Sequence, residues 1–138
     1  MQKNRILLLN THVWLWLLLG DKKIRKCTAI LEEASARENI RVSAISFWEV
    51  AMLHSKARIL LHMDCIEFLK KGLYAPGVSL LHTTPEIACQ SNSLQNFHGD
   101  PADRIITATS RIYGACRVTY DRAIQKFAKI SSIDVLAV

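Results

Sequence analysis

Three acids and one amide in this sequence stand at positions from which they could act together in catalysis. Asn10 follows an apolar run at residues 6–9, and Asp121 comes just after a predicted strand at residues 116–119. Glu49 and Asp103 fall near the starts of predicted helices. Several carboxylates gathered at one place repel one another unless a cation lies among them. Oxygen ligands without histidine or cysteine suit a hard ion, so the pattern indicates a site for Mg²⁺ or Mn²⁺.

Such an ion, held by a few carboxylates and waters, assists the hydrolysis of phosphodiester bonds. It orients the phosphate, lowers the pKa of the attacking water and stabilises the leaving oxygen. The chain has 18 Lys and Arg against 12 Asp and Glu, a formal net charge of +6. This balance favours a polyanionic partner and would hold the RNA backbone that the acids alone would repel. On charge alone, a basic protein without such a partner is an equal alternative.

Each candidate residue also has a structural explanation. Ser46 and Glu49 have the spacing of a capping box at a helix start. Asp100 is placed to cap the next candidate helix, and the helix dipole favours the acid Asp103 in its first turn. The other two candidates could be caps as well. Because Asp100 already serves as a cap, Asp103 is free for another role.

The elements that must position these residues alternate along the chain. An apolar run predicts a strand at residues 6–9, and further strands are predicted at residues 40–44, 78–81, 116–119 and 133–136. Helical patterns predict helices at residues 11–19, 24–37, 47–57, 64–74, 84–95, 101–113 and 122–127. The alternation predicts an α/β fold with a mainly parallel sheet between helical layers. In such sheets ligands bind beyond the carboxyl ends of the strands, at the topological switch point.

Two of the predicted helices carry an apolar stripe that we expect to face the core. In the helix at 24–37 the stripe includes Ile30 and Leu31, and in the helix at 64–74 it includes Ile66, Leu69 and Leu73. The three tryptophans also lie in apolar helices, which favours packing in the core or in a dimer. Stacking on RNA bases is the alternative role for these rings.

The chain as a whole is expected to be one domain over residues 1–138. Its four scattered cysteines show no zinc spacing and are predicted to be reduced, which indicates a cytoplasmic protein. The apolar run at residues 6–19 is interrupted by Asn10, Thr11 and His12. It also falls short of the roughly 18 apolar residues of a membrane span, so we expect no membrane segment.

Four segments of the sequence resemble a known family. LLLNTHVWLWLLLGD at residues 7–21, ISFWEVA at 45–51, GDPADRIITATS at 99–110 and VTYDRAI at 118–124 resemble the signature blocks of PIN-domain toxins of the VapC type. Their order and spacing also match. The resemblance implies a three-layer α/β/α sandwich around a parallel sheet of four or five strands. It further implies Mg²⁺- or Mn²⁺-dependent endoribonuclease activity, a VapB-type antitoxin partner and a homodimer.

The resemblance also implies roles for individual residues. The four metal-binding positions of the family fall on Asn10, Glu49, Asp103 and Asp121, and the accessory positions on Asp100, Thr119 and Thr11. Arg104, next to Asp103, is a candidate for contact with an RNA phosphate, and pairing with an acid is its equal alternative.

The sequence departs from the family at Asn10, where the resemblance implies aspartate. Asparagine is nearly isosteric with aspartate and caps a helix equally well, so the fold should survive. An amide oxygen is a weaker ligand for a hard cation than a carboxylate. We therefore expect poor metal occupancy and reduced RNA cleavage. The alternative function is a non-catalytic module that binds RNA or an antitoxin, and a flavodoxin-like nucleotide domain is disfavoured because no phosphate-binding glycine loop is present.

Overall fold

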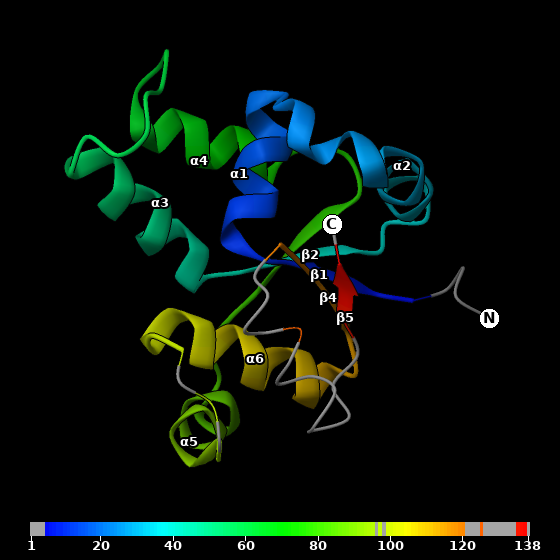
Figure 1. The fold of residues 1–138 in the computed structure, drawn as a ribbon, viewed down its shortest axis with the longest axis vertical. Coiled ribbons are helices and arrows are strands. Elements are labelled where there is room, and N and C mark those ends of the chain that lie inside the picture. Colours follow the sequence, from blue (N-terminus) through cyan, green and yellow to red (C-terminus); the bar gives the residue numbers. More distant parts are fainter. Residues whose placement is uncertain (1–4, 96, 98, 121–124, 126–134, 138) are drawn as a thin grey trace.

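The computed structural model describes residues 5–95, 97, 99–120, 125 and 135–137. Strands and helices alternate through most of this part of the chain, as Figure 1 shows. The strands are β1 (Leu7–Leu9), β2 (Ile40–Ser43), β3 (Val78–Leu81), β4 (Cys116–Thr119) and β5 (Val135–Ala137). The α-helices are α1 (Thr11–Leu19), α2 (Thr28–Ala36), α3 (Ile45–Ser55), α4 (Cys65–Leu73), α5 (Pro85–Ser93) and α6 (Pro101–Tyr113).

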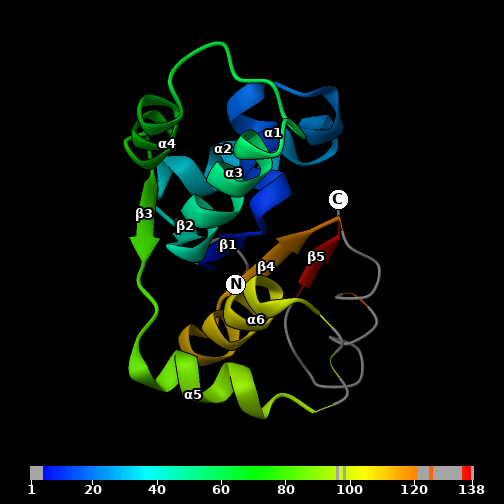
Figure 2. The same cartoon turned by 90° about the vertical axis from the view of Figure 1, so that its left-hand side faces the viewer.

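All five strands form one parallel sheet in the order β3-β2-β1-β4-β5. Figure 2 shows β3 and β5 on opposite sides of the central strand β1. The chain leaves β1 toward β2 on one side and later returns to β4 on the other, so the topological switch point lies between β1 and β4. The predicted parallel α/β fold is confirmed. The polar residues at the carboxyl ends of β1 and β4 therefore lie where such folds bind ligands.

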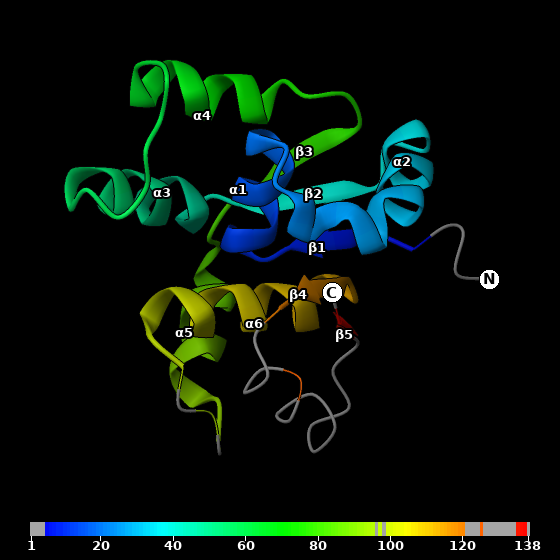
Figure 3. The same ribbon diagram turned by 45° about the horizontal axis from the view of Figure 1, so that its top comes forward.

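Helices cover both faces of the sheet. Figure 3 shows α1 to α4 on one side of the strands and α5 and α6 on the other. The side chains of β1 alternate between these layers, since Leu7 and Leu9 pack in the core on the side of α1 and α2. Leu8 packs with Ile106 of α6 on the opposite side. The three-layer sandwich predicted from the sequence is thus confirmed.

Glycines end the two helices that flank the switch point. Helix α1 ends at Gly20, with φ of 67°, and α6 ends at Gly114, with φ of 60°. A left-handed residue after a helix favours glycine, because other side chains are strained there. Both helices begin and end at the residues that the sequence predicts.

The predicted helix at residues 24–37 is wrong in its first turn. Residues Lys22–Cys27 form a 3₁₀ helix, labelled η2, before α2 begins. Ile24 and Cys27 are both buried, and the three-residue period of a 3₁₀ helix places them on the same face. Once α2 starts, Leu31 and Ala34 face the core, and the expected core residue Ile30 is 44% exposed.

Helix α4 buries only part of its predicted apolar stripe, since Leu69 packs against the core but Ile66 does not. Phe68 and Gly72 are its buried residues, whereas Ile66 is 64% exposed. A methyl group added at Gly72 would lie 2.6 Å from both Leu18 and Trp14 of α1. Close approach of α4 to α1 therefore decides which face is buried, and the apolar stripe alone does not.

Over the part of the chain that the structure describes, no helix is long and apolar enough to cross a membrane. The predicted helix at residues 122–127 lies almost entirely outside the described residues, as does the start of the predicted strand at 133–136.

Candidate active site

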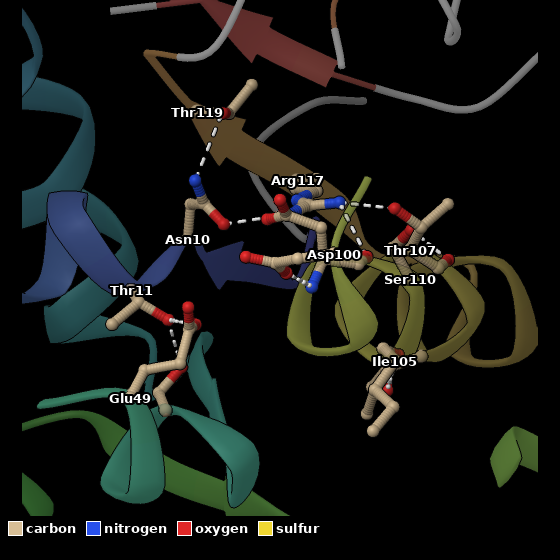
Figure 4. Close-up of polar contacts among 12 residues, drawn as sticks. Asn10, Thr11, Glu49, Asp100, Ile105, Thr107, Ser110, Arg117 and Thr119 are labelled. Carbon is tan, nitrogen blue, oxygen red and sulfur yellow. Dashed lines mark hydrogen bonds and ion pairs between the residues drawn. The ribbon is translucent and has the colours of Figure 1, made fainter. Parts of the chain in front are cut away.

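An open pocket of about 310 Å³ lies at the carboxyl ends of β1 and β4. It is lined by Asn10, Thr11, His12, Trp16, Glu49, Asp100, Asp103 and Tyr120. Figure 4 shows the polar contacts around it. The structure thus brings together three of the four predicted metal-binding positions from three separate parts of the sequence, at residues 10, 49 and 103. Asp121, the fourth position, lies outside the described residues.

Asn10 is 7% exposed and stands at the N-terminal end of α1. Its side chain makes no capping hydrogen bond to the helix. The side-chain Oδ1 accepts a hydrogen bond from Nη2 of Arg117 at 2.7 Å, and Nδ2 donates to Oγ1 of Thr119 at 3.3 Å. Asn10 therefore occupies the N-cap position of α1, as predicted, but its side chain does not cap the helix. The amide spans from β1 to β4 and presents its edge to the pocket.

Glu49 is not part of a capping box. Helix α3 begins at Ile45, two residues earlier than predicted, so Glu49 lies beyond its first turn. The backbone N–H of Ile45 donates to Oγ of Ser43 at 3.3 Å, and Ser46 is buried inside the helix. The earlier start removes the capping explanation for Glu49 and leaves its carboxylate directed at the pocket.

A hydroxyl pair holds the Glu49 carboxylate in place. Oγ1 of Thr11 donates to Oε1 of Glu49 and also shares a hydrogen bond of 2.8 Å with Oγ of Ser46. Burial raises the pKa of Glu49 above its ordinary value. The Thr11 hydrogen bond and the charge of Arg117 lower this pKa, while the charge of Asp100 raises it. A carboxylate in this setting gains from a nearby cation.

Asp100 and Asp103 divide two roles at the start of α6. Oδ1 of Asp100 accepts from the backbone N–H of Asp103 at 2.8 Å, so the predicted cap is confirmed. The side chain of Asp103 is 23% exposed, and its Oδ1 lies 3.4 Å from Nη2 of Arg117. Asp103 therefore lines the pocket and contacts the buried arginine.

Arg117 is a site residue that the sequence reasoning missed. It lies in β4 and is 0% exposed, with Nη1 donating to Oγ1 of Thr107 and to the backbone oxygen of Asp103, the latter at 3.4 Å. Arginine is almost never fully buried unless its charge is paired. The signal in the sequence was a lone arginine inside a strand that was expected to be covered on both faces.

Arg104 contacts backbone oxygens on the far side of α6. Its guanidinium donates to the carbonyl oxygens of Ser91, Leu94 and Phe97, at 2.9, 3.2 and 2.9 Å. These bonds tie the end of α5 to α6. Contact of Arg104 with RNA stays a prediction.

One wall of the pocket is aromatic. The rings of Trp16 and Tyr120 meet edge to face with their centroids 5.2 Å apart, and the amine of Lys23 lies 5.0 Å from the Trp16 centroid. Trp14, by contrast, is fully buried. Trp48 is 61% exposed, so the predicted packing in the core is confirmed for Trp14 and is wrong for Trp48.

The carboxylate oxygens of Glu49, Asp100 and Asp103 and the amide oxygen of Asn10 suit a hard divalent cation, although His12 also lines the pocket. Among the described residues, no three His, Cys, Asp or Glu side chains are placed to hold a metal ion by themselves. Mg²⁺ usually binds one or two carboxylates and keeps several waters. Glu49 and Asp103 therefore fit such an ion, with Asp100 close by.

The sequence matches the PIN domain family over residues 7–130. It is also 32% identical over 119 residues to Ribonuclease VapC22 of Mycobacterium tuberculosis, covering 86% of this chain and 88% of that protein.

Solved structures have the same fold. VapBC2 from Rickettsia felis, bound to a promoter DNA fragment, has a TM-score of 0.71 at 15% identity, covering 96% of this chain and 98% of that chain. DNA-bound VapBC from Salmonella typhimurium has a TM-score of 0.69 at 13% identity, with coverage of 96% and 98%. The parallel sheet, the acids at its switch point and these matches agree, and the chain belongs to the PIN domain family.

Proposed function

We propose that this protein is a Mg²⁺- or Mn²⁺-dependent endoribonuclease toxin of a VapBC-type pair. The observation that carries the proposal is the pocket at the switch point, where Asn10, Glu49 and Asp103 converge. The similarity to Ribonuclease VapC22 supports RNA as the substrate. The formal net charge of +6 also favours a polyanion.

The roles of the site residues follow from their positions. Glu49 and Asp103 would hold the cation, joined by Asp121, and Asp100 would serve as an accessory acid. When bound, the ion supplies activation of water and stabilisation of charge on the phosphate. Thr11 and Ser46 keep the Glu49 carboxylate in one orientation. Thr119 does the same for Asn10.

Asn10 is proposed to weaken this activity. It faces the pocket with an amide where the family resemblance implies a carboxylate, which removes one negative charge from the site. We therefore propose that metal occupancy and the cleavage rate are low, while substrate binding is less affected.

The proposed partners are a VapB-type antitoxin and a second copy of this chain. Several solved structures of the same fold are complexes of the VapBC type, some of them bound to DNA. We propose that residues 1–138 form one PIN domain that acts in the cytoplasm as part of such a complex.

The test is cleavage of RNA by the purified protein with Mn²⁺, compared with Glu49→Gln and Asp103→Asn. Glu67→Gln is the matched control, since Glu67 is an exposed acid on α4. We expect slow cleavage that EDTA stops, that both site variants abolish and that the control retains. Cleavage that persists in EDTA and in both site variants would overturn the proposal.

The amide at position 10 specifically favours a second function, a non-catalytic module that binds RNA or an antitoxin. Such a protein would retain its affinity for RNA in EDTA and would show no turnover with any divalent ion. Binding and cleavage measured side by side on the same RNA separate the two functions.

A further inference from the structure

Arg117 is buried directly behind the pocket. In the register of the sheet it pairs with Leu8 of β1, so its side chain lies on the face that packs against α6. It is 0% exposed and does not line the pocket. Any effect of Arg117 on a bound ligand must therefore act through the residues that it touches.

The guanidinium contacts two of the proposed metal ligands. Its Nη2 lies 2.7 Å from Oδ1 of Asn10 and 3.4 Å from Oδ1 of Asp103. The other terminal nitrogen, Nη1, donates a hydrogen bond to Oγ1 of Thr107. Guanidinium keeps its charge at every physiological pH, so Arg117 places a permanent positive charge against both side chains. Figure 4 shows Asn10 between this charge and Thr119.

We infer that Arg117 is a built-in cation that competes with the divalent ion for Asn10 and Asp103. The inference rests on the proposed function, because it concerns the same metal site. In this view Arg117 is a positioning residue that lowers the affinity of the site for metal. The amide at position 10 is the partner that fits it, since Oδ1 accepts the hydrogen bond without adding a charge.

The positive charge of Arg117 should limit the gain in metal affinity when a carboxylate is restored at position 10. In Asn10→Asp the new carboxylate would face Nη2 at hydrogen-bonding distance and form a buried ion pair. An acid neutralised in this way attracts a second cation only weakly. Restoring the acid should strengthen metal binding fully only when Arg117 is also replaced.

The experiment measures Mn²⁺ affinity by calorimetry and by the EPR signal of free Mn²⁺, using the full chain. The variants are Arg117→Met, Asn10→Asp and the double variant. Arg41→Met is the matched control, because Arg41 pairs with the same residue of β1 and its guanidinium bonds to the carbonyl oxygens of Glu38 and Ile40. It removes the same charge from the same level of the sheet, but from a guanidinium that bonds to backbone oxygens at the start of β2.

We expect Arg117→Met to bind Mn²⁺ about tenfold more tightly than the parent chain, because a unit charge a few ångströms away is worth at least that much. Asn10→Asp alone should gain less than the same change made in the Arg117→Met background. The control should leave the affinity unchanged. Arg117→Gln, which keeps hydrogen-bond donors without the charge, should also tighten binding, and it serves if Arg117→Met does not fold.

The outcomes separate this inference from the proposed function. If Glu49→Gln abolishes Mn²⁺ binding but neither Arg117 variant tightens it, the ion binds at the site and the inference about Arg117 is wrong. An equal gain from Asn10→Asp with and without Arg117 would also overturn it. If Glu49→Gln changes nothing in any background, the metal site itself is wrong.

Discussion

Glu49 shows how a single side chain can be placed for binding at a cost to the fold. Its carboxylate is held by Thr11 at the pocket, and partial burial raises its pKa. A raised pKa means that the folded chain prefers the protonated acid. At neutral pH the ionised Glu49 therefore destabilises the metal-free protein.

This predicts that Glu49→Gln is more stable than the parent chain at neutral pH when EDTA is present. Glutamine can still accept the Thr11 hydrogen bond, but it carries no charge. Because the folded pKa lies above the ordinary value of 4.5, the Glu49 contribution is most favourable below that value. It is lost as the pH rises through the folded pKa.

Urea denaturation at several pH values in EDTA checks this. The difference in unfolding free energy between variant and parent should be small near pH 4.5 and should grow toward pH 7. A variant that is less stable than its parent at every pH would show that burial of the charge does not dominate at this residue.

The sequence predicted the residues that line the pocket better than the reasons for their placement. Asn10, Glu49 and Asp103 converge as the parallel fold requires. Thr11 and Thr119 were expected as accessory positions, but their hydrogen bonds to Glu49 and Asn10 were not foreseen, and neither was the bond from Arg117, because each of these bonds joins two different elements. Whether Arg117 contacts Asn10 depends on the register of β4 against β1, and local spacing carries no information on that register.

Helices were predicted most accurately where both ends carry a local signal. Helix α6 has Asp100 as its cap, proline in its first turn and Gly114 at its end, and its bounds match the prediction. Asp21 caps the 3₁₀ helix at residues 22–27, since its side chain accepts from the backbone N–H of Lys23, but no local signal distinguishes a 3₁₀ helix from an α-helix there. There the burial of Ile24 and Cys27 against the rest of the core decides the local structure.

The contact between α1 and α4 gives a prediction at this scale. Gly72→Ala would place a methyl group 2.6 Å from Leu18 and from Trp14, both on α1. Overpacking of this kind destabilises by about 1–3 kcal/mol. Trp14 and Leu18 lie on α1 but do not line the pocket. The substitution should therefore lower the free energy of unfolding more than it lowers the affinity for metal.

Thermal unfolding of Gly72→Ala against Lys71→Ala tests this. Lys71 is exposed on the same helix, and an exposed substitution usually changes stability by no more than about 0.5 kcal/mol. Equal melting temperatures for the two variants would contradict the prediction, because they would mean that α4 can move away from α1 without loss of stability.

At the scale of the molecule, the reactivity of the four cysteines measures how accessible the core is to solvent. Cys27 and Cys116 are buried, and burial raises the pKa of both thiols. Cys89 is exposed and Cys65 is intermediate. A raised pKa and a closed core both suppress attack, because the thiolate is the reactive form.

Reaction with a disulfide reagent should therefore modify Cys89 first and leave Cys27 and Cys116 unmodified until the chain unfolds. Mass spectrometry of the partly reacted protein identifies the modified residues, and the same reaction in guanidinium chloride gives the fully reacted control. Early modification of Cys116 would contradict the central position of β4, because that residue lies beside Leu7 in the middle of the sheet.

The central place of β1 has a consequence for synthesis. Asn10 is separated along the chain from Arg117 by 107 residues and from Thr119 by 109, yet its side chain bonds to both. During translation β1 can pair with β2 early, but its second partner, β4, is made about a hundred residues later, and such distant pairings form slowly. A growing chain thus lacks Tyr120 of the pocket and both hydrogen-bond partners of Asn10 until β4 has left the ribosome. If the protein cleaves RNA as proposed, it cannot attack the message from which it is being translated until that point.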